Sequence, residues 1–195
     1  THPEGNTPLY RRGAIARFVG HDDLALKHEG ENPTGSFKDR GMASAFSYIH
    51  AMILRGEVSE ILAICASTGD TSAAAALYLA YLPKGTVKSV VLLPAGKVTP
   101  QQLSQPLGSG ATVIQVPGVF DDCMRIVEEL SRDYQVFLLN SKNPVRINGQ
   151  KSYAYEVAMD AGWRTEDLAL FVPIGNAGNV TAVMEGFLDL LRLGM

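Results

Sequence analysis

Residues 61–73 read Ile-Leu-Ala-Ile-Cys-Ala-Ser-Thr-Gly-Asp-Thr-Ser-Ala, and they change from apolar to small and polar after Cys65. The first five form a short apolar run of the kind that makes buried strands, and the small, hydroxylated residues after them are typical of a turn. An alanine-rich segment follows. Because Pro83 cannot continue a helix, we expect this helix to cover 71–82. The stretch therefore predicts a strand, a tight loop and a helix in succession.

The same alternation continues towards the C-terminus. Apolar runs predict strands, and segments with apolar residues at helical spacing predict helices between them. The predicted strands are 87–93, 111–116, 136–139 and 168–173, and the predicted helices are 100–107, 119–132, 150–161 and 180–193. Strands and helices joined by short connections indicate an α/β fold with a parallel sheet covered by helices. Right-handed crossovers would gather the loops that follow the strands at one edge, where ligands usually bind.

Upstream, residues 31–40, Glu-Asn-Pro-Thr-Gly-Ser-Phe-Lys-Asp-Arg, predict a turn and then a helix that Ser36 can cap. Lys38 then falls in the first turn of the helix. There the positive end of the helix dipole and partial burial would both lower the pKa of its amine. An amine of lowered pKa forms a Schiff base with an aldehyde more readily. On spacing alone, a solvated lysine beside Asp39 is an equally good interpretation.

Three further loops follow predicted strands. Residues 66–73 and 173–179 combine small residues with the first N–H groups of a helix, an arrangement that binds anions. Residues 140–151 supply groups that suit a phosphate or a carboxylate, namely Asn140, Ser141 and Arg146. Each loop alone could equally be a capped turn, a plain strand–helix turn or an exposed polar loop. Taken with the lysine, all three could converge on one crevice.

The composition argues against several classes of function. The net charge is −3 and there is no basic run, so neither nucleic acid nor a membrane surface is an expected partner. Cys65 and Cys123 are each isolated, and the 4 histidines lack metal-ligand spacing, so no metal is expected. The glycines of 173–179 fit neither common nucleotide-binding pattern. No apolar stretch is long enough to span a membrane, and we expect a reducing, cytoplasmic location.

Four segments together resemble the successive motifs of fold-type II enzymes that depend on pyridoxal 5′-phosphate (PLP). They are 5–9, 32–40, 67–73 and 175–179, in the same order and at similar distances. Within that family, residues 140–151 and the 175–179 loop are most similar to threonine synthases. Asp70, where most relatives carry Asn, resembles the plant-type branch. The resemblance implies an α/β fold similar to that of the tryptophan synthase β subunit.

The resemblance also implies a role for each motif. Lys38 would bind PLP covalently and later move protons between substrate carbons, and Asp70 would lie beside the 3′-oxygen of the cofactor ring. The substrate would be O-phospho-L-homoserine, converted with water to L-threonine and phosphate. The cofactor phosphate would be bound by Gly175, Asn176, Ala177, Gly178 and Asn179. The substrate carboxylate and phosphate would be bound by Ser67, Thr68, Thr71, Asn140, Ser141 and Arg146, with Lys151 a weaker candidate.

Alternatives stay open within the family. They are a threonine or serine dehydratase, a phosphohomoserine lyase, or a truncated, non-catalytic paralogue. Arg146 bears on the choice, because a substrate that carries phosphate needs it and serine does not. Asp70 departs from the common pattern: like charges in contact raise a pKa, so we expect its carboxyl group and the 3′-oxygen to share one proton.

The resemblance also predicts how the chain is organised. Residues 1–41 and 137–195 are expected to form parts of a large PLP-binding domain, and 42–136 a smaller α/β domain. The chain resembles only the first part of a threonine synthase, so we expect an incomplete large domain without the residue that contacts the pyridine nitrogen. We therefore also expect the chain to lack full catalytic activity when it is alone. Family members are often dimers, which implies a homodimer.

Overall fold

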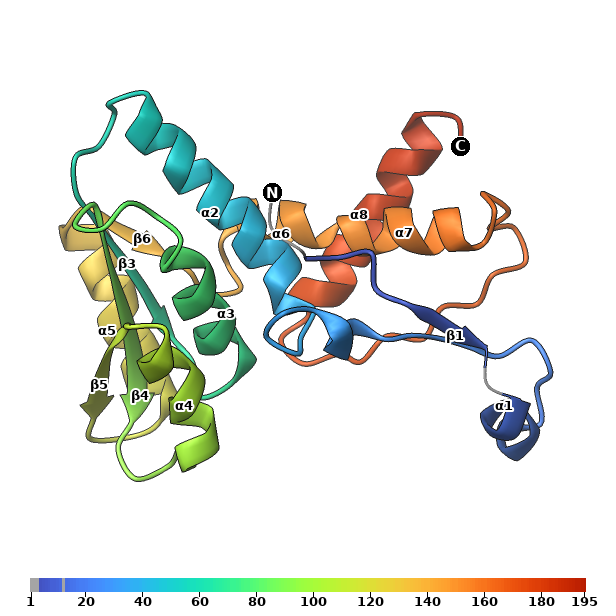
Figure 1. Cartoon of the computed structure of the whole chain (residues 1–195), viewed down its shortest axis with the longest axis horizontal. Coiled ribbons are helices and arrows are strands. Elements are labelled where there is room, and N and C mark those ends of the chain that lie inside the picture. Colours follow the sequence, from blue (N-terminus) through green and yellow to red (C-terminus); the bar gives the residue numbers. More distant parts are fainter. Residues whose placement is uncertain (1–3, 12) are drawn as a thin grey trace.

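The computed structural model describes residues 4–11 and 13–195, and its core is a four-stranded parallel sheet (Figure 1). The strands lie in the order β5-β4-β3-β6. They are β3 (Ile61–Ala66), β4 (Val87–Pro94), β5 (Thr112–Val116) and β6 (Val136–Leu138). β3 is central, with Ile61 opposite Val87 of β4 and Leu62 opposite Val136 of β6. Since all four strands are parallel, the loops that follow them share one edge.

Helices cover both faces of this sheet, and the alternation of side chains along β3 explains why. Ala63 and Cys65 point to one face and join a core with α2, α3 and α4, whereas Ile64 and Ala66 point to the other face and contact α5. The helices are α2 (Lys38–Leu54), α3 (Asp70–Leu79), α4 (Pro100–Gly108) and α5 (Phe120–Asp133). The predicted α/β arrangement of a parallel sheet between helices is therefore confirmed.

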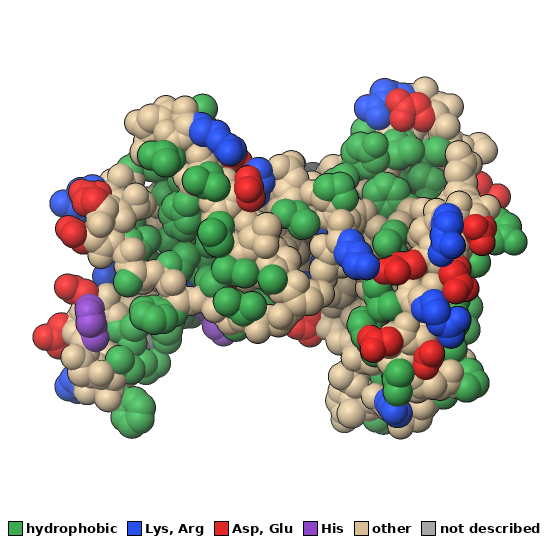
Figure 2. Space-filling model, turned by 180° about the vertical axis from the view of Figure 1, so that it is seen from behind, with side chains coloured by type: hydrophobic (Ala, Val, Ile, Leu, Met, Phe, Trp, Pro, Cys, Tyr) green, Lys and Arg blue, Asp and Glu red, His purple; other side chains and the backbone are tan. Residues whose placement is uncertain are grey.

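A second group of helices lies beyond α2, which runs diagonally between it and the sheet (Figure 1). It consists of α6 (Pro144–Gln150), α7 (Ser152–Asp160) and α8 (Gly178–Arg192). α7 and α8 pack closely at Gly186, where an added Cβ would lie 2.7 Å from the Ala154 Cβ. Exposed apolar side chains, including Phe171 and Leu191, gather on this half, whereas charged side chains of both signs intermingle on the half that carries α5 (Figure 2).

The N-terminal segment is attached to this second group through a buried arginine. It contains the antiparallel strands β1 (Leu9–Arg11) and β2 (Ala25–Lys27), the helix α1 (Gly13–Val19) and the short 3-10 helix η1 (Glu29–Glu31). Arg40 donates to Glu29 at 2.7 Å and to Glu156 of α7 at 2.6 Å. Glu156 also accepts the backbone N–H groups of Asn6, at 2.7 Å, and Thr7. One carboxylate thus joins the segment around residues 5–9 to the helix that begins at Lys38.

Most predicted elements are present within two or three residues of their expected ends, but one prediction is wrong. Residues 168–173 were predicted to form a strand, yet they form none and pair with no strand in the described part of the chain. The helix predicted for 150–161 is α7, which begins two residues later, at Ser152. Residues 140–151 also contain α6, a helix that the sequence did not predict. Asn143 explains the start of α6, because its side chain accepts the N–H of Val145 at 2.9 Å.

Candidate functional site

Lys38 is the first residue of α2, as the sequence predicts. Ser36 contributes to the start of this helix, since its hydroxyl accepts the backbone N–H of Lys38 at 3.2 Å, although Phe37 occupies the cap position. The lysine amine lies 4.2 Å from the centre of the Phe37 ring. Burial lowers the pKa of Lys38, the nearby Arg146 guanidinium lowers it further, and Asp70 opposes this effect. The amine therefore carries the lowered pKa that the sequence led us to expect.

The loop before Lys38 is held by the next residue along the helix. Asp39 is fully buried and accepts both the backbone N–H of Thr34, at 2.7 Å, and the Thr34 hydroxyl. Burial raises the pKa of Asp39, the two bonds from Thr34 oppose the rise, and the nearby carboxylates of Glu4 and Asp70 add to it. The interaction closes the turn of residues 34–39 and so sets the position from which the Lys38 side chain leaves the backbone.

Two glycines allow α2 and α6 to cross in close contact. A Cβ on Gly41 would lie 2.9 Å from the backbone oxygen of Arg146, and a Cβ on Gly149 would collide with the backbone oxygen of Arg40. Glycine at both positions is therefore required for this crossing. The first turns of the two helices come together, and the crossing brings Arg146 close to Lys38.

Arg146 is almost completely buried, with 1% of its surface exposed. Its Nη1 donates to the backbone oxygen of Leu139 at 2.6 Å, whereas the buried Nε and Nη2 have no hydrogen-bond partner among the described residues. Burial lowers the pKa of Arg146 to about 10. Burial likewise raises the pKa of the neighbouring Cys65 thiol to about 12, so this thiol does not neutralise the guanidinium. Buried donors without partners are rare, and two on one guanidinium form the fork that binds a carboxylate or phosphate.

The loop that follows β3 is joined to the loop that follows β6 by Asn140. Its side-chain oxygen accepts the N–H of Ala66 at 3.0 Å, and its amide donates to the Ala66 oxygen at 2.7 Å. Beyond Ala66, the Ser67 hydroxyl accepts the N–H of Gly69, and α3 begins at Asp70. The predicted residues Thr68, Asp70 and Thr71 thus lie on one short loop and helix start, at the same sheet edge as Asn140.

The loop before α8 lies against the same region. Asn176 donates from its amide to the Ser141 hydroxyl at 3.0 Å. Ala177 has a φ of 64°, so a residue with a side chain adopts the left-handed conformation at the start of the helix. The first N–H groups of α8, from Gly178 and Asn179 onward, have no partners within the helix and are available to an anion.

The amine of Lys151, a weaker candidate in the sequence, is engaged away from this group. It donates to Asp189 of α8 at 2.9 Å and lies 4.0 Å from Glu185. This ion pair raises the pKa of Lys151. Sequence reasoning also missed the roles of Asp39 and of the glycines at 41 and 149. The only sequence signal for the glycines was their residue type, because a glycine inside a helix often marks a place where another backbone packs closely.

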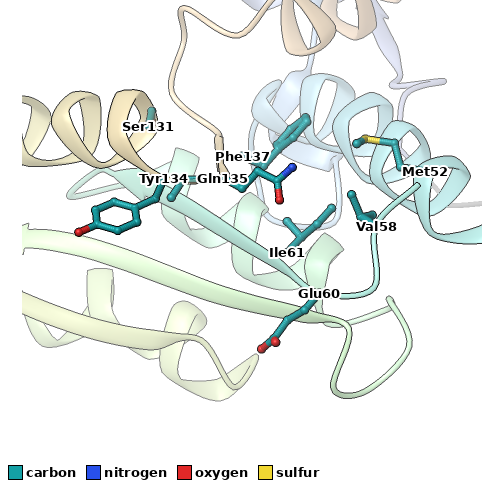
Figure 3. A pocket seen from close by; sticks show the side chains of 9 residues that line it. Met52, Val58, Glu60, Ile61, Ser131, Tyr134, Gln135 and Phe137 are labelled. Carbon is teal, nitrogen blue, oxygen red and sulfur yellow. The ribbon is translucent and has the colours of Figure 1, made fainter. Parts of the chain in front are cut away.

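A separate hollow of about 280 Å³ lies at the opposite edge of the sheet (Figure 3). Ile61 at the start of β3, Val136 at the start of β6 and Val58 contribute to its mainly apolar lining. Glu60, on its rim, is engaged in an ion pair with Lys88 at 2.6 Å. Since the strands are parallel, this hollow is at the far end of the sheet from Lys38 and contributes nothing to the candidate site.

None of the helices within residues 4–11 and 13–195 is both long and apolar enough to cross a membrane. Likewise, no group of three or more His, Cys, Asp or Glu side chains in those ranges could hold a metal ion.

The residues at the loop edge fit PLP. Lys38 offers an amine of lowered pKa for an aldehyde, and the start of α8 offers N–H groups for a phosphate. The unpartnered donors of Arg146 offer a second anion site close to the same amine. A parallel α/β sheet with a lysine and two groups of donors for anions at its loop edge is the arrangement expected of an enzyme that uses PLP as its cofactor.

Comparison with known proteins identifies the family. The chain belongs to the family described as pyridoxal-phosphate dependent enzyme, whose sequence model matches residues 1–193. It is 45% identical over 192 residues to a threonine synthase of Methanocaldococcus jannaschii, a match that covers 98% of this chain and 45% of the relative. A threonine synthase of Synechocystis is also 45% identical, with 98% and 47% covered. The chain spans about half the length of the curated relatives it matches.

Solved structures agree with the fold. A yeast threonine synthase superposes with a TM-score of 0.66 at 27% identity, covering 91% of this chain and 37% of that one. Maize serine racemase superposes with a TM-score of 0.77 at 19% identity, covering 95% and 53%. The fold-type II class and the dependence on PLP are therefore confirmed.

Proposed function

We propose that the protein acts as a threonine synthase, converting O-phospho-L-homoserine and water to L-threonine and phosphate. The observation that carries this proposal is Arg146, a buried guanidinium with two unpartnered donors close to Lys38. An amino-acid substrate that bears phosphate needs such a group, and one without phosphate would leave the buried charge unbalanced. The identity of 41–45% to curated threonine synthases, over nearly the whole of this chain, supports the same substrate.

The proposed roles are those that the family resemblance implies, and the positions of the residues support them. When bound, PLP supplies an electron sink that stabilises negative charge on substrate carbons. Lys38 would hold the cofactor through Nζ and would carry protons between substrate carbons, for which a lowered pKa is suited. The N–H groups at the start of α8 bind the cofactor phosphate, with Gly175, Asn176, Ala177, Gly178 and Asn179 as the binding loop. Asp70, at the start of α3, would be the residue that faces the ring oxygen of the cofactor.

The substrate is held by the two remaining loops. Arg146 and Ser141 bind its phosphate, and the loop of Ser67, Thr68 and Thr71 binds its carboxylate. Asn140 contributes from between them, since its amide retains one hydrogen beyond its bonds to Ala66. Lys151 is left out of the proposed site, because its amine is engaged by Asp189.

The experiment that tests this proposal measures products directly. The chain is incubated with PLP and O-phospho-L-homoserine, and threonine and phosphate are quantified together. Equal amounts of both are expected, with loss of at least a hundredfold in rate on Arg146→Gln and none on Lys142→Gln, an exposed change on the loop that precedes α6. L-Serine and L-threonine are tested in parallel. Faster formation of keto acids from them than of threonine from the phosphorylated substrate would assign the protein to the dehydratases instead.

The organisation of the protein is part of the proposal. We propose that 42–136 form a smaller α/β domain and that 1–41 and 137–195 belong to the PLP-binding domain, with α2 passing between them (Figure 1). We also propose a homodimer. Limited proteolysis tests the domain limits, and sedimentation equilibrium tests the dimer: a single species at 21.0 kDa would contradict it.

A further inference from the structure

We propose that Phe37 acts as a proton-dependent latch for the Lys38 side chain. The face of its ring holds the charged ammonium group of Lys38 and releases the neutral amine. Phe37 is then a positioning residue, because it acts on the chemistry only through the lysine. The inference rests on the dependence on PLP that the family shows, and it does not depend on which substrate the protein converts.

The contact between the two side chains is close. The Lys38 amine lies over the Phe37 ring, 4.2 Å from its centre, and a ring face attracts a cation within about 6 Å. Consecutive side chains of a helix do not face each other. The contact is therefore not a by-product of helix geometry, because the long lysine chain must bend back towards the ring to make it.

The Lys38 amine has no stronger partner nearby. Within residues 4–11 and 13–195 it makes no hydrogen bond and no ion pair, although its side chain is half-buried. A charge that has lost part of its water and has no hydrogen-bonded partner is costly. The attraction of a ring for a cation also grows as water is removed. The ring of Phe37 is thus an interaction that decides where the charged amine rests.

The charged groups around the amine act in opposite directions. Arg146, on α6, disfavours the ammonium form, whereas Asp70, on α3, favours it from an exposed position where water weakens its effect. On α2 itself, the buried Asp39 is bonded to Thr34 instead. Further titratable groups lie beside Asp39 or Arg146, and they are Glu4, Tyr78 and Cys65. The ring therefore adds to a balance in which no ion pair fixes the amine.

The attraction depends on the proton. A ring face is the negative part of the ring quadrupole, so it attracts an ammonium group and has no comparable attraction for a neutral amine. When Lys38 loses its proton to solvent water, the side chain is free to leave the ring. The neutral amine is also the form that attacks an aldehyde. The latch thus releases Lys38 in the protonation state in which it can react.

The test follows Lys38 by NMR in the chain without PLP or substrate. Lysines are labelled with ¹³C at Cε, and the Lys38 signal is assigned through the Lys38→Arg variant. Because the ring favours the charged form, Phe37→Leu is expected to lower the midpoint of the Lys38 titration by about half a pH unit, a roughly threefold change in proton affinity. Phe37→Tyr keeps a ring that attracts cations and should keep the midpoint. The exposed Lys84 should not respond to either change.

Ring fluorination separates attraction by the ring from a change in packing. Fluorine withdraws negative charge from the ring face and alters its shape little. Phenylalanine analogues with one, two and three ring fluorines at position 37 should therefore lower the midpoint in steps. Equal midpoints across this series would overturn the proposal, whatever Phe37→Leu does.

Side-chain mobility tests the release itself. In the unsubstituted chain, NMR relaxation should show the Lys38 Cε as rigid below the midpoint and mobile above it, whereas in Phe37→Leu it should be mobile on both sides. Equal mobility on both sides of the midpoint in the unsubstituted chain would also overturn the latch. Because neither substrate nor activity enters these measurements, absence of threonine synthesis would overturn the proposed function and leave the latch standing.

Discussion

The backbone oxygen of Arg146 lies 2.9 Å from the point where a Cβ on Gly41 would stand. A carbon and a carbonyl oxygen cannot hold that separation without a shift, and both atoms belong to helices that have little room to move. Gly41 therefore determines how closely the helix that carries Lys38 approaches the helix that carries Arg146.

Gly41→Ala is expected to destabilise the fold by about 1–3 kcal/mol, because the methyl group forces α2 and α6 apart. Urea denaturation measures the effect. Gly108→Ala in α4 is the matched control, since a Cβ there meets nothing within 4 Å and alanine favours a helix. Equal stability of Gly41→Ala and the unsubstituted chain would show that the crossing can relax.

Glu156→Gln is expected to lower the free energy of unfolding at neutral pH but not in strong acid. Burial opposes ionisation of Glu156, but the bonds from Arg40, the Asn6 backbone and Lys27 outweigh it and hold its pKa at about 2, below the ordinary 4.5. A lowered carboxyl pKa stabilises the fold above pH 4.5, and the contribution disappears as the pH falls towards 2. The difference should be on the order of 2 kcal/mol at pH 7.

The stability of both proteins is measured by urea denaturation between pH 7 and the acid limit of folding. Glu129→Gln, at an exposed ion pair on α5, serves as the control and should change stability by under about 0.5 kcal/mol at any pH. If the difference in free energy of unfolding between Glu156→Gln and the unsubstituted chain were the same at every pH, the substitution would be removing a packing contact and not a charge.

Asn140→Ala should lower the free energy of unfolding by about 1–3 kcal/mol, because it removes the side chain that bonds the buried N–H and oxygen of Ala66. Asn148→Ala, at an exposed position of α6, is the control. Hydrogen exchange gives the sharper measurement. The Ala66 amide should lose protection in the first variant and keep it in the second.

Asp70→Asn should make the Lys38 amine easier to deprotonate. Asp70 favours the charged form of Lys38, so its replacement should lower the pKa of that amine further. In the chain loaded with PLP, the visible absorption band should also titrate differently, because the carboxyl group can no longer share a proton with the ring oxygen. Superimposable titration curves for the two proteins would exclude that shared proton.

The sequence predicted the sheet and its loop edge well, because short apolar runs such as 61–65 and the helices between them are local patterns. It also placed Lys38 in the first turn of its helix. The strand expected at 168–173 failed for a non-local reason: an apolar run forms a strand only where another strand pairs with it. The site was harder to predict. No local sequence pattern around Arg146 indicates that two of its donors are buried without partners. The ion pair of Lys151 with Asp189 could not be predicted either, because the two residues are 38 positions apart.

The Arg40–Glu156 pair has a consequence for the order in which the chain folds. The two residues are 116 positions apart, and Asn6 lies 150 positions from the same carboxylate. Contacts of such long sequence separation require a large loop to close, and closing it costs entropy. During synthesis from the N-terminus, the sheet strands β3 to β6 are added to the chain before Glu156. The contact that joins the helix of Lys38 to α7 therefore becomes available only after the whole sheet has been synthesised.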